Sequence, residues 1–275
     1  MGKPLSFFYR RTQLSGRVRR QVADRLGARS NPSGDVSQDI CIGVKMSPGL
    51  IRHDKLIARE SMGDYYLDFI DHHTCYDWLS HWPDVKVIVA SRSSEAWLSA
   101  RLRNPLTFIP QHHCNVEGVR RPDRPIRVVG YVGMMSEIPP WFDLVTDTVT
   151  AMGLEMRWFT DFQDRQDVVR AYDQIDIQFA WREGMPEKLL WTKNPLKVLN
   201  AGAFAIPTVA KEEPGYDYEC PGAYAPCRTL GEAFEQIAAL RDPSHYAALA
   251  ERAWAVSQPY HLDTIADAFR RLADA

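Results

Sequence analysis

Short runs of apolar residues alternate along the chain with longer amphipathic segments. The short runs are rich in Val, Ile, Phe and Tyr, as strands are, and the longer segments place apolar residues three or four positions apart, as helices do. This alternation is typical of βαβ units and a mostly parallel sheet. In the first half it predicts strands at 5–9, 40–44, 65–70, 85–90 and 106–109, and helices near 15–27, 74–80 and 94–102.

The same alternation starts again in the second half. It predicts strands at 127–131, 156–159, 175–179 and 208–210, and helices near 141–152, 166–172, 195–203, 230–240, 243–253 and 262–272. The stretch between the halves, HCNVEGVRRPDRPIR, has two prolines and no apolar periodicity, so it is interpreted as a linker.

The fold class that follows is α/β, with two Rossmann-like domains facing across a cleft. Their expected ranges are 1–113 and 127–258, and residues 259–275 form a last helix that we expect to pack back toward the first domain. Ligands bind beyond the carboxyl ends of the strands in such sheets, so the cleft is the expected site.

Composition narrows the class of protein. Of the 275 residues, 45% are hydrophobic and 25% charged, as in an ordinary globular chain. No apolar run is long enough to span a bilayer and no secretory signal opens the chain, so we expect a cytoplasmic protein without a membrane span. The five cysteines are scattered, which indicates reduced thiols, and no Cys, His or carboxylate spacing indicates a protein-bound metal.

Charge is unevenly distributed between the halves. Residues 1–127 hold 20 Lys and Arg against 13 Asp and Glu, whereas residues 128–275 hold 13 against 22. Arginines crowd the first 29 residues, and Arg10, Arg17 and Arg20 are the candidates for binding an acidic acceptor. Attraction between the two domains, or a solvated arginine-rich helix, remains the alternative explanation.

The stretch KNPLKVLNAGAFAIPTV, residues 193–209, is the most informative in the chain. Pro195 stands at the first turn of a predicted helix, and Lys193 and Lys197 flank it four positions apart. A helix N-terminus offers unpaired N–H groups and partial positive charge, so with two lysines it suits a diphosphate. The alternative is an amphipathic helix with solvated lysines.

This stretch resembles the donor site of GT-B glycosyltransferases. Lys193, Lys197 and Asn200 match the K-x-x-x-K-x-x-N-A signature, Pro207 closes it, and Glu213-Pro214-Gly215-Tyr216 matches the E-P-x-Y element that follows. Ala205 occupies a position where the signature has glycine, and Asn200 one where many retaining members have glutamate. The resemblance is best over residues 127–240. It implies the GT-B fold, a nucleotide-sugar donor, UDP-sugar foremost, bound by the second half as substrate with no other cofactor, and transfer of a hexose or pentose.

Two further residues follow predicted strands and complete the donor candidates. Gly133 lets a phosphate or sugar approach the backbone, and the Trp181 indole packs either on a nucleobase or in the core. The full set of candidate donor-binding residues is Gly133, Trp181, Lys193, Pro195, Lys197, Asn200 and Glu213.

The catalytic candidates lie in the first half, where a base must take the proton of the acceptor hydroxyl. Asp71 directly follows a predicted strand and is the first candidate, with His72 second and His112 and His113 as further alternatives. A helix N-cap is the competing role for Asp71.

The acceptor is left open by the residues themselves. The arginine-rich start, and a resemblance to phage enzymes that glycosylate their own DNA, indicate a hydroxymethylated pyrimidine in DNA, against a surface glycan, a lipid-linked intermediate or a small molecule. A nucleotide-sugar epimerase, a glycoside phosphorylase and a non-enzymatic binding module are the other classes to distinguish. The oligomeric state and the stereochemistry of transfer are not indicated.

Overall fold

The computed structural model describes residues 2–9, 14–45, 62–70, 75–122, 124–135 and 139–274. It divides into two compact units. The first comprises residues 1–112, 186–194 and 260–275, and the second comprises residues 113–185 and 195–259. The last helix is therefore part of the first unit, and the stretch interpreted as a linker is part of the second.

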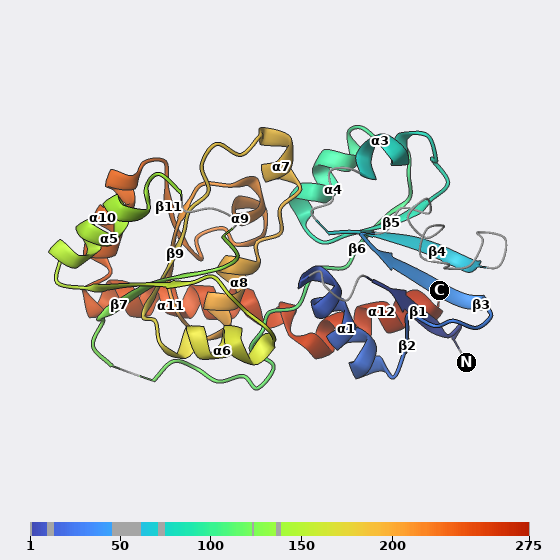
Figure 1. The fold of residues 1–275 in the computed structure, drawn as a ribbon, viewed down its shortest axis with the longest axis horizontal. Helices are drawn as coiled ribbons and strands as arrows, with labels where there is room; N and C mark the ends of the chain where they lie inside the picture. The colour runs from blue at the N-terminus through green and yellow to red at the C-terminus, as the bar shows by residue number, and fades with distance from the viewer. Residues whose placement is uncertain are drawn as a thin grey trace. The chain divides into compact units, whose positions relative to one another are not determined.

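The first unit is built on a six-stranded parallel sheet of order β2-β1-β3-β4-β5-β6. Helices α1 and α12 pack against each other beside β1, where Phe7 meets Phe269 edge-on with 5.2 Å between ring centres (Figure 1). Helices α3 and α4 contribute Leu79 and Leu98 to a separate core cluster with β4 and β5. The elements are β1 (Leu5–Phe8), α1 (Leu14–Leu26), β2 (Arg29–Ser30), β3 (Val36–Val44), β4 (Met62–Phe69), α3 (Cys75–Ser80), β5 (Lys86–Val89), α4 (Arg92–Ser99), β6 (Leu106–Phe108), α7 (Glu187–Trp191) and α12 (Leu262–Asp274).

The second unit has a five-stranded parallel sheet of order β11-β10-β9-β7-β8. Helices α5 and α10 contact each other on one face of this sheet, whereas α8 packs on α11 on the other (Figure 1). The elements are β7 (Val128–Val132), α5 (Phe142–Ala151), β8 (Glu155–Phe159), α6 (Arg165–Asp173), β9 (Ile177–Ala180), α8 (Leu196–Ala203), β10 (Thr208–Lys211), α9 (Pro214–Glu219), β11 (Ala225–Cys227), α10 (Leu230–Ala239) and α11 (Pro243–Ser257).

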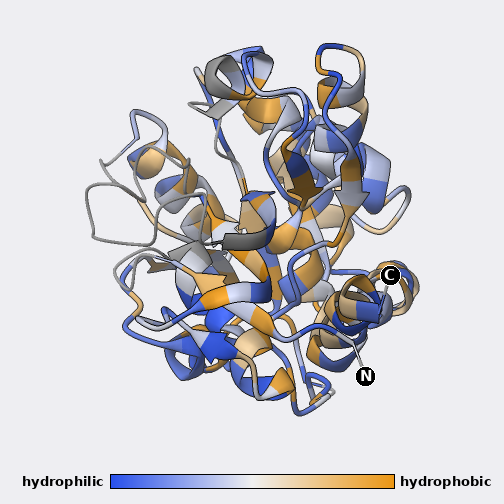
Figure 2. Cartoon of the chain, turned by 90° about the vertical axis from the view of Figure 1, so that its right-hand side faces the viewer, coloured by the Kyte–Doolittle hydropathy of each residue, from blue (hydrophilic) through white to orange (hydrophobic). Residues whose placement is uncertain are grey.

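Hydrophobic residues concentrate along the strands, and the helices alternate between hydrophobic and hydrophilic positions (Figure 2). Strands covered by helices on both faces must be apolar throughout, which is why all five residues of β7 are buried. Helix α8 approaches α11 closely because Gly202 has no side chain: a Cβ there would lie 2.5 Å from the carbonyl oxygen of Ala253.

The segment that precedes β7 is held to the second unit by a buried carboxylate. Asp176 is 1% exposed, and one of its oxygens accepts hydrogen bonds from the guanidinium groups of Arg121 and Arg124. The other oxygen accepts the backbone N–H groups of Arg127 and Val128 at 2.7 and 2.8 Å. Interpretation of this segment as a linker was therefore incomplete, because its arginines are fixed to the start of β9.

The α/β class with parallel sheets is confirmed, and each predicted strand overlaps an observed one. Among the described residues, five short elements were not predicted: β2, α7, α9, β11 and a 3-10 helix at Gln258–Tyr260. Each has six residues or fewer, too few for apolar periodicity to emerge. No helix among the described residues is long and apolar enough to cross a membrane.

Candidate functional site

The carboxyl edge of the second unit's sheet carries the candidate site. Strand β8 lies on one side of β7 and β9 on the other, so the connections that leave β7 and β9 run over opposite faces. The crevice at such a switch point is where open parallel sheets bind their ligands. Gly133 directly follows β7, and Trp181 and Arg182 follow β9, so these residues border the switch point.

Lys197, in the first turn of α8, holds its ammonium group against the backbone that leaves β7. A Cβ at Gly133 would lie 2.8 Å from Lys197 Cε and 2.9 Å from Nζ, closer than ordinary van der Waals contact. The buried Nζ also lies 3.8 Å from the centre of the Tyr131 ring, within cation–π range. A side chain at position 133 would therefore force the end of the Lys197 side chain to shift, and glycine leaves room for this cation in its present place.

Arg182 supplies a second cation at the same edge. It forms an ion pair with Glu213, which is 2% exposed and directly precedes α9, and its guanidinium carbon lies 5.8 Å from the centre of the Tyr216 ring. Burial raises the pKa of Tyr131 and of Tyr216; in both, Arg182 opposes the rise and Glu213 adds to it. The same ion pair thus acts on both phenols. We call Tyr131, Arg182, Lys197, Glu213 and Tyr216 the switch-point cluster.

The cluster carries two cations against one carboxylate, in partly desolvated surroundings. Such an arrangement attracts an anion, because positive charge that is screened from water interacts more strongly with a ligand. Arg182 was missed as a site residue by sequence reasoning. The available signal was a cation two residues beyond a buried strand, directly after Trp181.

Trp181 belongs to the core, the second of the two roles considered for it. Its side chain is 2% exposed and stacks on Phe179 with ring centres 5.9 Å apart. Its indole is also a member of the main core cluster of the second unit. A ring buried in this way has no open face for a nucleobase, so the structure gives it a packing role instead.

Comparison with known proteins identifies the fold. No protein-family model matches the chain, and no curated protein matches its sequence. Among solved structures, Anabaena HepE in complex with UDP and glucose superposes with a TM-score of 0.67 at 12% identity, over 99% of this chain and 100% of HepE. TarM superposes with a TM-score of 0.58 at 14% identity, over 88% of this chain and 56% of TarM. The trehalose 6-phosphate synthase of Burkholderia multivorans superposes with a TM-score of 0.53 at 11% identity, over 97% of this chain and 78% of the synthase.

The chain has a GT-B fold. Its two parallel α/β sheets are the Rossmann-like domains of that architecture, as predicted, and the switch-point cluster lies in the second of them. At these identities the likeness establishes the architecture.

The predicted donor residues are distributed over both units of the GT-B fold. Lys193 belongs by its contacts to the first unit, whereas Pro195 and Lys197 belong to the second. Pro195 is the residue before α8, and its carbonyl accepts the N–H groups of Val198 and Leu199. The role of Lys193 beside Lys197 therefore stays a prediction.

Asn200 holds a structural contact within the second unit. Its side-chain oxygen accepts the backbone N–H of Cys114 at 2.8 Å, and its amide also hydrogen-bonds the buried Tyr172. These bonds fix the chain that enters the unit onto α8. The structure thus engages the Asn200 side chain in the packing of the segment that begins at Cys114. Its place among the donor ligands stays a prediction.

The catalytic candidates Asp71 and His72 and the acceptor candidate Arg10 lie outside the described residues. Of the alternatives, His112 is 3% exposed and its Nε2 lies 3.2 Å from the carbonyl oxygen of Val18, so its ring contacts α1 from the segment that follows β6. His113 is 2% exposed. Both rings are enclosed by protein, which leaves neither open to an acceptor hydroxyl.

The arginines of the first helix do not form one free basic surface. Arg19 is fully buried: it pairs with Asp68 at 2.6 Å and donates to the carbonyls of Ile109 and Pro110. Burial raises the pKa of Asp68, and the Arg19 guanidinium opposes that rise. In the same helix Arg20 pairs with Asp24 and Arg25 with Asp263, and Arg29 of β2 pairs with Asp39.

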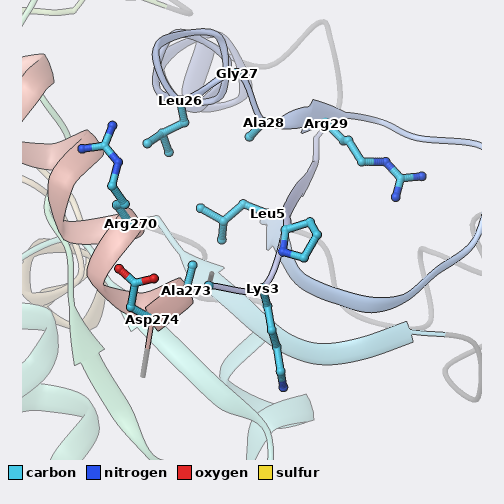
Figure 3. A pocket seen from close by; sticks show the side chains of 11 residues that line it. Lys3, Leu5, Leu26, Gly27, Ala28, Arg29, Arg270, Ala273 and Asp274 are labelled. Atoms are coloured by element: carbon cyan, nitrogen blue, oxygen red, sulfur yellow. The ribbon is translucent and has the colours of Figure 1, made fainter.

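A pocket of about 290 Å³ lies at the amino end of β1 (Figure 3). Leu5, Leu26 and Ala28 face its interior, whereas Lys3 and Arg29 extend away from it. Lys3 is paired with Asp64 at 2.7 Å. Arg270 and Asp274 of α12 also line it, so its lining is mixed. The pocket lies at the edge of the sheet opposite to the one where GT-B domains hold ligands, so we assign it no part in the site.

No group of three or more His, Cys, Asp or Glu side chains in the described parts of the chain could hold a metal ion. Cys114 is one of the buried cysteines, and burial raises the pKa of its thiol to about 12, which makes a reactive thiolate unfavourable at neutral pH. The two cations of the switch-point cluster suit the binding and stabilisation of an anion.

Proposed function

We propose that this protein is a glycosyltransferase that binds a nucleotide-sugar at the switch point of its second unit. The observation that carries the proposal is the position of Lys197, whose ammonium group fills the space beside Gly133 at the carboxyl end of β7. A cation fixed at this place suits the diphosphate of a nucleotide-sugar, which must lie close to the backbone there.

Transfer breaks the bond between the sugar's anomeric carbon and the diphosphate, and forms a new bond from that carbon to the acceptor oxygen. The electron pair of the broken bond leaves with the nucleoside diphosphate, so negative charge develops on its β-phosphate. Lys197 and Arg182 are assigned to stabilise that charge. Glu213 orients Arg182 through their ion pair, and the Tyr131 ring positions Lys197 through a cation–π contact.

UDP is the proposed nucleotide. Support comes from the HepE complexes, which contain UDP with glucose and UDP-glucose, and whose whole length superposes on 99% of this chain. The sugar is proposed to be a hexose or pentose. Lys193 is retained as an auxiliary cation for the diphosphate, and Asp71 as the base that takes the acceptor's proton, with His72 as the alternative.

The acceptor is proposed only as a hydroxyl group on a carbohydrate or small molecule. The 5-hydroxymethylpyrimidine of DNA, indicated by the arginine-rich start, has less support because Arg19 is buried and Arg20 is 3.6 Å from Asp24. A DNA acceptor would need several free cations along one surface to neutralise phosphates. DNA is therefore kept as one arm of the acceptor screen.

Isothermal titration with UDP tests the donor site directly. Lys197→Ala should weaken UDP binding by about 1.5–3 kcal/mol, the range for hydrogen bonds to charged groups. Lys188→Ala is the matched control, because Lys188 is an exposed lysine of α7 and should leave the affinity unchanged. Equal UDP affinity in wild type and Lys197→Ala would refute the assignment.

A second experiment separates transfer from the competing classes. Wild type is incubated with UDP-sugars, alone and with glycan, small-molecule and hydroxymethylated DNA acceptors, and the products are identified by mass spectrometry. Conversion of donor alone to an isomer would indicate an epimerase, and UDP binding without any product would favour a binding module. If Asp71 is the base, Asp71→Asn lowers turnover by roughly two to four orders of magnitude and leaves UDP affinity intact.

A further inference from the structure

A second pocket of about 700 Å³ lies in the same unit at the opposite, amino edge of the sheet. One wall comes from the segment before β7 and the other from the turn between α10 and α11 together with the start of α11. Ile126 and Gly133 stand at the two ends of β7, so the pocket and the switch point are roughly 20 Å apart along the strand direction. The eight residues that line the pocket are Arg121, Arg124, Pro125, Ile126, Arg241, Pro243, Tyr246 and Ala247.

Three arginines line this pocket, and no carboxylate of the described residues does. Asp176 is paired with two of them, Arg121 and Arg124, but it is 1% exposed and does not itself line the pocket. Arg241 has no carboxylate partner among its described contacts; it donates to the carbonyl of Met152 at 3.0 Å. Among the described lining residues and Asp176, three guanidinium groups stand against one carboxylate, which leaves an excess of positive charge.

The arginines are held in place before any ligand arrives. Arg121 has both Nε and Nη2 on Asp176 and lies 5.2 Å from the centre of the Tyr246 ring, whose hydroxyl donates to the carbonyl of Asp176 at 2.7 Å. Arg124 donates to the same carboxylate and to the carbonyls of Asp173 and Ile175. Fixed cations bind an anion with less loss of side-chain entropy than mobile ones do.

The rest of the lining is apolar. Pro125, Ile126, Pro243 and Ala247 and the ring of Tyr246 offer a surface for a hydrophobic or planar group beside the cations. A doubly charged head with an apolar or ring-bearing body matches both features. Guanidinium groups bind phosphate in forked geometry, and a phosphomonoester dianion balances two positive charges.

We propose that this pocket binds a small organic phosphomonoester at a site separate from the donor site. The pocket lies at the amino edge of the sheet, and none of its residues belongs to the switch-point cluster. A ligand held here contacts the turn that begins α11 and the segment that enters β7. It therefore adds a second small-molecule site to the unit, independent of the proposed transfer reaction.

Phenyl phosphate is the probe, with phenol and inorganic phosphate as partial probes, and binding is followed by isothermal titration. Arg241→Ala should weaken phenyl phosphate binding at least about tenfold, the loss expected for one charged hydrogen bond. Arg252→Ala is the matched control, since Arg252 is an exposed arginine of α11 outside the pocket, and Lys197→Ala controls for binding at the donor site. Both controls should bind as wild type does.

A pair of variants that each introduce one negative charge tests the same pocket without removing an arginine. Ala247→Glu places a carboxylate in the lining, whereas Ala248→Glu places one at the next exposed position of α11 outside it. The first should abolish binding and the second should retain it, with equal melting temperatures. Three results would overturn the proposal. Wild type would fail to bind phenyl phosphate at about 10 mM, ten times a millimolar Kd. Alternatively, both glutamate variants would lose binding equally, or only Lys197→Ala would lose it.

Discussion

Gly133→Ala is the sharpest test of how Lys197 is positioned. The added Cβ would lie 2.8 Å from Lys197 Cε and 2.9 Å from Nζ, whereas ordinary contacts begin at 3.4 Å. The end of the lysine side chain must therefore move by about half an ångström or more, away from the backbone that follows β7. The backbone of Gly133 lies outside the left-handed region, so alanine introduces no conformational strain and the effect is confined to space.

The expected loss in UDP affinity follows from that displacement. Lys197 keeps its charge in this variant but loses the geometry of its bond to the diphosphate, so we expect about 1–2 kcal/mol, less than on complete removal of the amine. This corresponds to roughly a 5- to 30-fold increase in Kd. Isothermal titration with UDP measures it, and thermal unfolding without ligand checks that the fold is intact.

The matched control is Gly231→Ala. Gly231 is an exposed glycine in the first turn of α10, and a Cβ there would meet only the Thr229 hydroxyl, at 3.7 Å. UDP affinity should not change in this control. Wild-type affinity in Gly133→Ala, together with a weakened Lys197→Ala, would mean that the lysine adapts freely and that the space beside Gly133 is not what positions it.

Three further predictions concern stability and nucleic-acid binding. Ala205 has a φ of 57°, so Ala205→Gly should relieve left-handed strain and raise the free energy of unfolding by about 0.5–1 kcal/mol, measured by urea titration. Ala203→Gly, at the buried last residue of α8, should instead lower the free energy of unfolding. Burial pushes the pKa of Asp176 upward, but hydrogen bonds from the Arg127 N–H and the arginines outweigh it and leave that pKa lowered. The carboxylate therefore stabilises the fold above its unfolded pKa of about 3.9, and this contribution is lost as pH falls through the lower folded pKa. Asp176→Asn should flatten the pH dependence of unfolding below about pH 4, and no change there would contradict the assignment. If the protein binds DNA, changing Arg17 and Arg20 to serine should reduce the slope of binding against salt concentration in gel-shift titrations, and failure of wild type to bind at low salt would exclude a DNA acceptor.

The sequence by itself determined the order and type of the main elements. Apolar runs such as KVIV in β5 and VVGYV in β7 are too hydrophobic for exposed strands, and the intervening segments have helical periodicity, so two parallel α/β sheets could be predicted. The chain also indicated Lys197 and Gly133 as site residues, because a cation at a helix start and a glycine at a strand end have local signatures. Local patterns of this kind survive folding because they depend on neighbouring residues.

Tertiary structure decided which polar side chains remain available for a ligand. Arg19 and Arg17 look alike in the sequence, yet Arg19 is enclosed between Asp68 and Phe269. Asn200 fits the donor signature, but the N–H of Cys114, 86 positions away, occupies its oxygen. Arg182 joined the site only when β9 and β10 paired and brought Glu213 beside it. These outcomes depend on partners far away along the chain, and a one-dimensional pattern contains no information about which distant group will occupy a given donor or acceptor.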